Sequence, residues 1–192
     1  AHVVDLLFPN FDDNSLSETD GEGPATEDTY VAKPPVVLDE PGIAYVANVN
    51  ADYVGVYDIA NDRGLASIRL PDGSAPKTVA TSMDGKFVYV GTSSKNEVYV
   101  IYTGSNQLFR TVPTTGIPLS IDVLPNTQDL LVLTESGQIE FFSYLDFIPG
   151  KTIEVNGTPG KIAAEANVIA HINNSPDAAG TAQFWVNGSE SP

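Results

Sequence analysis

The side chains that most often carry catalysis or bind metals are few in this chain and lie far apart. It has no cysteine, which excludes thiol nucleophiles, thiolate metal sites and disulfides, and its two histidines are His2 and His171. His171 lies in the apolar run VIAHIN, so it is interpreted as a hydrogen-bonded residue of the fold and not as a ligand. A catalytic site requires several such groups to converge. The sequence therefore predicts no enzyme activity, no catalytic or metal-binding residue and no cofactor.

An acidic run near the start of the chain is the second group that is capable of chemistry, because hard cations bind several carboxylate oxygens. Its spacing does not fit the calcium-binding loop template D-x-[DN]-x-[DN]-G-x₅-E. We interpret the run as a solvated linker. Its members are Asp12, Asp13, Glu18, Asp20 and Glu22.

Charge is unevenly distributed over the 192 residues, whose formal net charge is −16. Residues 1–40 hold ten acidic residues against Lys33 alone. Phosphate backbones and anionic lipids bind proteins through Lys and Arg, so neither nucleic acid nor an anionic membrane surface is an expected partner. Basic proteins and cations remain possible partners, although negative charge also serves solubility.

The chain divides into two regions by composition. Residues 1–33 read as an extended acidic arm or linker, because residues 12–30 contain almost no aliphatic side chains to bury. Residues 34–192 read as the folded domain. No apolar run reaches the length of a membrane span. The Ala1-His2 start is what a signal peptidase would leave, so the expected location is periplasmic or extracellular.

Short strands separated by turn residues fill the body of the chain, and no long segment keeps a helical period. Pro76, Pro118 and Pro159 recur 42 and 41 residues apart, each before an apolar strand. Four strands per unit of about 42 residues is the size of a propeller blade. Each unit also has a central strand with an anchor residue, and the four anchors are Tyr45, Tyr89, Leu131 and Ile169.

Residues 74–118 resemble the YVTN-type β-propeller repeat. The resemblance rests on Asp-Gly-Lys at 84–86, the Tyr89-Val90 strand, Asn-x-Val-x-Val at 96–100, and the proline at 118 that opens the next unit. It extends over residues 34–186, with the fourth unit the most divergent. It implies an all-β, propeller-like array of about 3.5 to 4 four-stranded antiparallel blades. Propellers of this kind serve as binding platforms, adhesion modules and parts of periplasmic dehydrogenases.

Closure of the array has three possible solutions, because free sheet edges invite aggregation. In the first, the apolar segment 3–8 supplies the missing last strand. In the second, another chain completes the array, and in the third the native chain is longer. Four aromatic residues near the two ends either close the fold or bind a partner. They are Phe8, Phe11, Phe184 and Trp185.

The predicted function is a non-catalytic, extracytoplasmic scaffold that binds other proteins. The predicted partners are the subunits of a membrane complex or further copies of the chain itself. Two alternatives from other classes are a subunit or fragment of a periplasmic electron-transfer enzyme and a cell-surface adhesion module.

Overall fold

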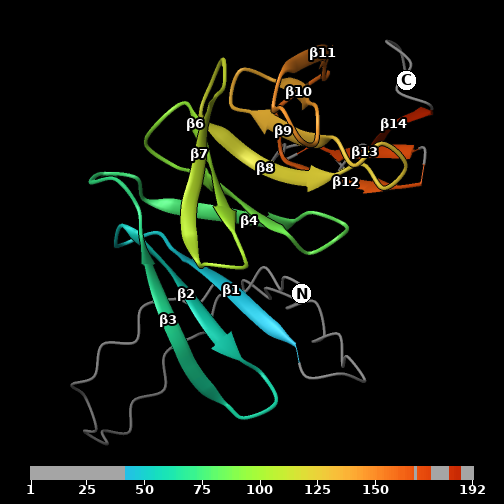
Figure 1. The fold of residues 1–192 in the computed structure, drawn as a ribbon. Helices are drawn as coiled ribbons and strands as arrows, with labels where there is room; N and C mark the ends of the chain where they lie inside the picture. Colours follow the sequence, from blue (N-terminus) through green and yellow to red (C-terminus); the bar gives the residue numbers. More distant parts are fainter. Residues whose placement is uncertain (1–41, 167, 174–181, 187–192) are drawn as a thin grey trace, which may run out of the picture.

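The computed structural model describes residues 42–166, 168–173 and 182–186, and the secondary structure of this part consists of strands and turns without helix. The strands form four antiparallel sheets that follow one another along the chain (Figure 1). We call these sheets blades one to four. The all-β, blade-like architecture predicted from the sequence is confirmed.

Blades one and two are consecutive meanders, in which each strand pairs with the next along the chain. Blade one contains β1 (Ile43–Asn48), β2 (Tyr53–Asp58) and β3 (Arg63–Arg69). Blade two contains β4 (Pro76–Thr81), β5 (Phe87–Thr92), β6 (Glu97–Tyr102) and β7 (Gln107–Pro113).

Blades three and four repeat the same meander. Blade three contains β8 (Pro118–Val123), β9 (Leu130–Thr134), β10 (Gln138–Phe142) and β11 (Pro149–Glu154). Blade four contains β12 (Lys161–Glu165), β13 (Val168–Ile172) and β14 (Ala182–Val186). By this pattern, the described part of blade one lacks a first strand and that of blade four lacks an outer fourth strand.

Tight turns end the strands where the sequence places glycine. Gly85 (φ 69°) and Gly137 (φ 80°) adopt the left-handed conformation that L side chains rarely tolerate. Gly85 follows Asp84 between β4 and β5, and Gly137 follows Ser136 between β9 and β10. These two glycines let each strand reverse at once onto its neighbour.

Three apolar cores hold the blades together, one at each junction. Tyr45 and Val54 of blade one pack with Val88 of blade two. Tyr89 of blade two packs with Val132 of blade three in the second core. The third core joins blade three to blade four and contains Leu131, Leu133, Ile139, Phe141, Ile153, Ile162, Ile169 and Trp185. Since a twisted sheet cannot cover its own faces, each blade is stabilised by its neighbours.

The predicted equivalence of Ile169 with Leu131 is wrong by one residue. Leu131 lies in the core shared with the following blade, whereas Ile169 lies in the core shared with the preceding one. The cause is a shorter connection, because β12 ends at Glu165 and β13 begins at Val168. A change of one residue moves a side chain to the other face of a strand. Ile169 therefore corresponds to Leu130.

The first strands of blades two to four lie side by side on the inner side of the array. Ser120 and Asp122 of β8 accept hydrogen bonds from two backbone amides of β12, those of Ile162 (3.2 Å) and Ala164 (2.8 Å). Side chains of one blade thereby satisfy the otherwise unpaired edge of the next.

Several predictions lie outside the described residues. They are the acidic arm 1–33 and its boundary at residue 34, His2, the acidic run, the strand predicted at 3–8, and the aromatic residues Phe8 and Phe11.

Candidate functional site

Five aromatic rings meet where the outer ends of blades two and three adjoin, and we call them the aromatic rim. Phe87 at the start of β5 is at their centre, with ring centroids 5.3 Å from Phe109, 5.8 Å from Phe147 and 6.0 Å from both Tyr102 and Tyr144. Such tilted and edge-to-face contacts stabilise aromatic clusters beyond their burial. The rim therefore has a defined ring arrangement.

The rim is partly open to solvent. Phe109 on the outer strand β7 is 56% exposed and Tyr102 at the end of β6 is 42% exposed, while Phe87 and Phe147 beneath them are buried. The Tyr102 ring lies across Gly104, where an added Cβ would come within 2.7 Å of it. Met83 and Leu145, in turns that flank the rim, are also exposed.

A polar network fixes the turn beside the rim. Asp84 accepts hydrogen bonds from the Ser82 hydroxyl (2.8 Å), the Lys86 amide (3.1 Å) and the Tyr144 hydroxyl, and its carboxylate lies 2.9 Å from Lys86 Nζ. Because Tyr144 belongs to blade three, Asp84 links the two blades. Arg110 stacks over the Phe147 ring at 5.7 Å.

The network shifts the pKa values of its members in opposite directions. Partial burial acts to raise the pKa of Asp84, but the hydrogen bonds from Tyr144, Lys86 and Ser82 outweigh it and hold that pKa well below its ordinary value. Burial, and then the bond to the Asp84 carboxylate, raises the pKa of Tyr144 to about 12. Asp84 is thus an anion and Tyr144 a neutral donor at neutral pH.

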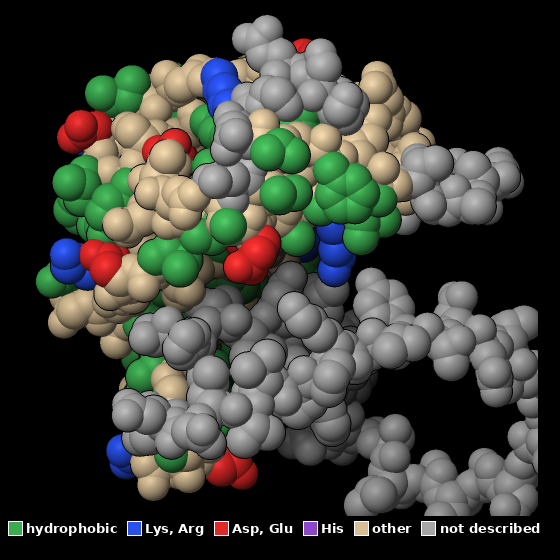
Figure 2. Space-filling view, turned by 90° about the vertical axis from the view of Figure 1, so that its right-hand side faces the viewer, with side chains coloured by type: hydrophobic (Ala, Val, Ile, Leu, Met, Phe, Trp, Pro, Cys, Tyr) green, Lys and Arg blue, Asp and Glu red, His purple; other side chains and the backbone are tan. Residues whose placement is uncertain are grey.

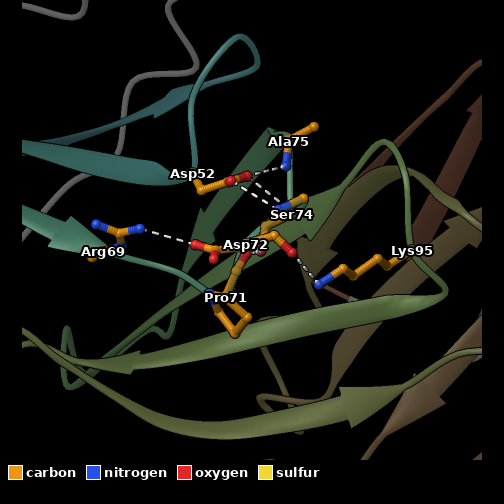
Figure 3. A network of polar contacts seen from close by, with 8 residues as sticks. Asp52, Arg69, Pro71, Asp72, Ser74, Ala75 and Lys95 are labelled. Carbon is orange, nitrogen blue, oxygen red and sulfur yellow. Dashed lines mark hydrogen bonds and ion pairs between the residues drawn. The ribbon is translucent and has the colours of Figure 1, made fainter.

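A second carboxylate fastens blade one to blade two. Asp52, in the β1–β2 turn, points at the loop before β4 and accepts three backbone hydrogen bonds, from Gly73 (2.8 Å), Ser74 (2.7 Å) and Ala75 (3.1 Å) (Figure 3). These bonds, those of Gly73 and Ala75 first, lower the pKa of Asp52. These three partners are backbone amides of the next blade's entry loop, which identifies Asp52 as a structural clamp.

In blades two to four, the side chain at one corresponding position of the third strand forms a hydrogen bond with the loop that precedes the first strand of the same blade. The Tyr99 hydroxyl lies 3.3 Å from Ser74 Oγ, Glu140 accepts the Thr115 amide at 2.9 Å, and Gln183 accepts the Asn156 amide at 3.1 Å. The repeat in the sequence does not reveal this set, because a tyrosine, a glutamate and a glutamine share the role.

His171 is a structural residue, as predicted. It is fully buried, accepts the Gly160 amide through Nε2 at 3.2 Å, and lies 3.2 Å through Nδ1 from Gln183 Oε1. Burial lowers its pKa. Within the described part of the chain it contacts Gly160, Gln183 and the Trp185 ring.

The two predicted partner-binding residues within the described part lie on opposite faces of β14. Trp185 is fully buried in the core between blades three and four, whereas Phe184 is 54% exposed. Trp185 thus serves the fold, and partner binding by Phe184 stays a prediction.

Sequence reasoning missed the aromatic rim. Its rings come from the three strands β5, β6 and β7 and from the β10–β11 turn, and Phe109 lies 22 positions after Phe87 and 38 positions before Phe147. A local signal is the pair Leu108-Phe109, two successive large apolar residues that both lie exposed on the outer strand β7.

Within residues 42–166, 168–173 and 182–186, no group of three or more His, Cys, Asp or Glu side chains is arranged to hold a metal ion. The same part of the chain contains no helix long and apolar enough to cross a membrane. Hydrophobic side chains reach the surface between scattered acidic and basic groups on the face in Figure 2.

Comparison with known proteins supports the fold. No family model and no curated protein matches the sequence. Among solved structures, hydrazine synthase of Kuenenia stuttgartiensis is similar, with a TM-score of 0.67 and 16% identity over 84% of this chain and 51% of its own. The WD40 repeats of RRP9 match with a TM-score of 0.60 and 11% identity, over 77% and 58% of the two chains.

A third similar structure, U3-55K, has a TM-score of 0.58 and 12% identity over 69% of this chain and 45% of its own. The chain therefore spans about half the length of the solved structures it matches. These likenesses show a fold of the β-propeller type.

Proposed function

We propose that this chain is a non-catalytic, extracytoplasmic scaffold of the YVTN repeat type that binds another protein through the aromatic rim, as part of a membrane-associated assembly. The observation that carries the proposal is the exposure of Phe109 and Tyr102 above the buried Phe87 and Phe147. Aromatic residues anchored in this way, with arginine beside them, are the side chains most enriched at energetically dominant protein contacts.

The chemistry of the rim favours a protein over a small molecule. The exposed rings of Phe109 and Tyr102 belong to the outer part of blade two, and Asp84, Lys86 and Arg110 lie beside the rim with charges already engaged in contacts of the fold. Such a surface offers apolar area with a polar border, which is the anatomy of a protein interface. The WD40 repeats of RRP9 belong to the same fold type.

Site-specific photocrosslinking tests the proposal. A photoreactive phenylalanine analogue at position 109, introduced into the full chain in its source cells, is expected to crosslink one defined protein. The same analogue with Tyr102→Ser is expected to lose most of that product, because removal of a dominant aromatic contact weakens binding about thirtyfold or more.

The control places the analogue at Val49, an exposed apolar residue in the β1–β2 turn of blade one. A single product from position 109 that is absent from position 49 supports the proposal. Identical products from both positions, or none from position 109, contradict it. Fractionation of the crosslinked cells tests the proposed location at the same time.

A subunit of a propeller enzyme is the second candidate, because one of the similar structures is named as a hydrazine synthase. This candidate predicts that a complex isolated through the chain turns over a redox substrate. It also predicts that Phe109→Ser separates the chain from the activity. Absorbance of the intact complex between the near ultraviolet and the red distinguishes it from a scaffold that binds only colourless proteins.

A further inference from the structure

Blade four has one covered and one uncovered face. Ile162, Ile169 and Trp185 on the covered face pack against blade three. On the other face, Ile172, Phe184 and Val186 are 57%, 54% and 57% exposed. Large apolar side chains lie in adjacent strands on this face, because Ile172 is in β13 and the other two are in β14.

The same positions are buried in the preceding blade. Leu133 stands opposite Ile139 in blade three as Ile172 stands opposite Ala182 in blade four, and Phe141 stands opposite Leu131 as Phe184 stands opposite Ala170. Leu133 and Phe141 are only 0% and 5% exposed, since blade four covers them. Blade four therefore presents a face whose counterpart in blade three is a blade junction.

Blade one presents the complementary end. Its covered face, with Tyr45 and Val54, packs on blade two. On its other face the Tyr57 ring is 45% exposed and lies over Gly55, where an added Cβ would be 2.6 Å from the ring. Glycine beneath the ring gives a broad aromatic surface that an apolar sheet face can contact.

A second copy of this chain presents the same two faces and can therefore meet both ends of the array. Each copy contributes four blades, and closed propellers typically have 4 to 8. At each described junction, the face that one blade turns toward the following blade packs on the face that the following blade turns back toward it. A second copy that continues the array in the same direction repeats this kind of junction.

We propose that the outer face of blade four, around Ile172 and Phe184, docks on the blade one face around Tyr57 of a second copy, and that two copies close one ring head to tail. This inference rests on the proposed scaffold function and deepens it, because it identifies a second copy of the chain as one protein partner. It uses a different surface from the aromatic rim.

The test uses the full chain and measures its mass in solution by sedimentation velocity and native mass spectrometry at micromolar concentration. The expected wild-type species is a dimer of the 20.4 kDa chain. Phe184→Lys and Tyr57→Asp are each expected to raise the dissociation constant at least thirtyfold, because each removes an apolar anchor and buries a charge. Phe109→Ser, which alters only the aromatic rim, is expected to remain a dimer.

Mixing the two variants decides the geometry. A pair of Phe184→Lys with Tyr57→Asp has one intact junction, and its second junction places a lysine opposite an aspartate. The mixture is therefore expected to recover a heterodimer, which also demonstrates that both variants fold. If the two copies instead met through blade four of each, the Tyr57→Asp variant would remain a dimer and mixing would recover no heterodimer.

A monomeric wild-type chain overturns the proposal, as does a dimer that survives Phe184→Lys, a dimer that survives Tyr57→Asp, or failure of the mixture to recover. A failed dimer leaves the crosslink from position 109 unaffected, and a missing crosslink leaves the dimer unaffected. The two results thus separate this proposal from the scaffold function.

Discussion

Single carboxylates link neighbouring blades at two connections of this repetitive fold. Asp52 fixes the loop between blades one and two through three amides, and Asp84 fixes a turn of blade two to Tyr144 of blade three. Each acts as an anion that accepts several hydrogen bonds, which is the condition that lowers a carboxyl pKa. At the residue scale, the acidity of these groups is thus coupled to stability.

The first prediction concerns Asp84→Asn. Its folded-state pKa is lowered, so the ionised carboxylate stabilises the fold above the ordinary value of 3.8, and this contribution is lost progressively as the pH falls below that value. Asp84→Asn is expected to lower the melting temperature at pH 7 by about 2 to 4 °C, the effect of losing about one kcal/mol in a chain of this size. The difference from wild type is expected to shrink by pH 3.

Asp62→Asn is the matched control, because Asp62 is an exposed carboxylate in the β2–β3 turn outside this network. Melting curves of all three proteins by circular dichroism between pH 7 and pH 3 give the comparison. A difference between wild type and Asp84→Asn that stays constant across this range would contradict the role assigned to the carboxylate.

At the element scale, the positions of the strands were predictable from the sequence, but which side chains face each blade junction was predictable only in part. Alternating apolar residues bounded by Asp-Gly and Ser-Gly turns located the central strands, such as β5 and β9, to within a residue of their observed bounds. The face of β13 was not predictable, because a repeat of 42 residues does not show in which loop a residue is missing. The aromatic rim was not predictable either, since its rings meet only when two blades pack.

Strand β14 gives the second prediction, because its alternation divides two adjacent aromatic residues between fold and surface. Trp185 is fully buried against blade three, so Trp185→Ala is expected to destabilise the fold by about 3 to 5 kcal/mol. Trp185→Phe is the control: it keeps a ring in the core and removes an indole N–H that has no hydrogen-bond partner in the described part of the chain. It is expected to cost less than half as much.

Urea denaturation followed by circular dichroism measures both free energies of unfolding. Equal losses for Trp185→Ala and Trp185→Phe would mean that the indole N–H, and not the buried ring, is what blade four requires.

At the scale of the whole molecule, charge opposes compactness. The net charge is −16, while the described residues show three ion pairs, Arg63 with Asp58, Arg69 with Asp72 and Lys86 with Asp84. The cationic side chain is exposed in all three pairs, and both side chains are exposed in the Arg69–Asp72 pair, so screening these pairs costs little. Screening the mutual repulsion of the acidic excess removes a larger unfavourable contribution.

The last prediction follows from this imbalance. At pH 7, raising the salt concentration from about 0.01 M to 0.15 M shortens the screening length from about 30 Å to 8 Å, which is less than the size of the array. The melting temperature is therefore expected to rise by several degrees. Near the isoelectric point of 4.1 the same change is expected to have little effect, because the net charge is close to zero there. A melting temperature that falls with salt at pH 7 would show that attractive pairs outweigh the acidic excess.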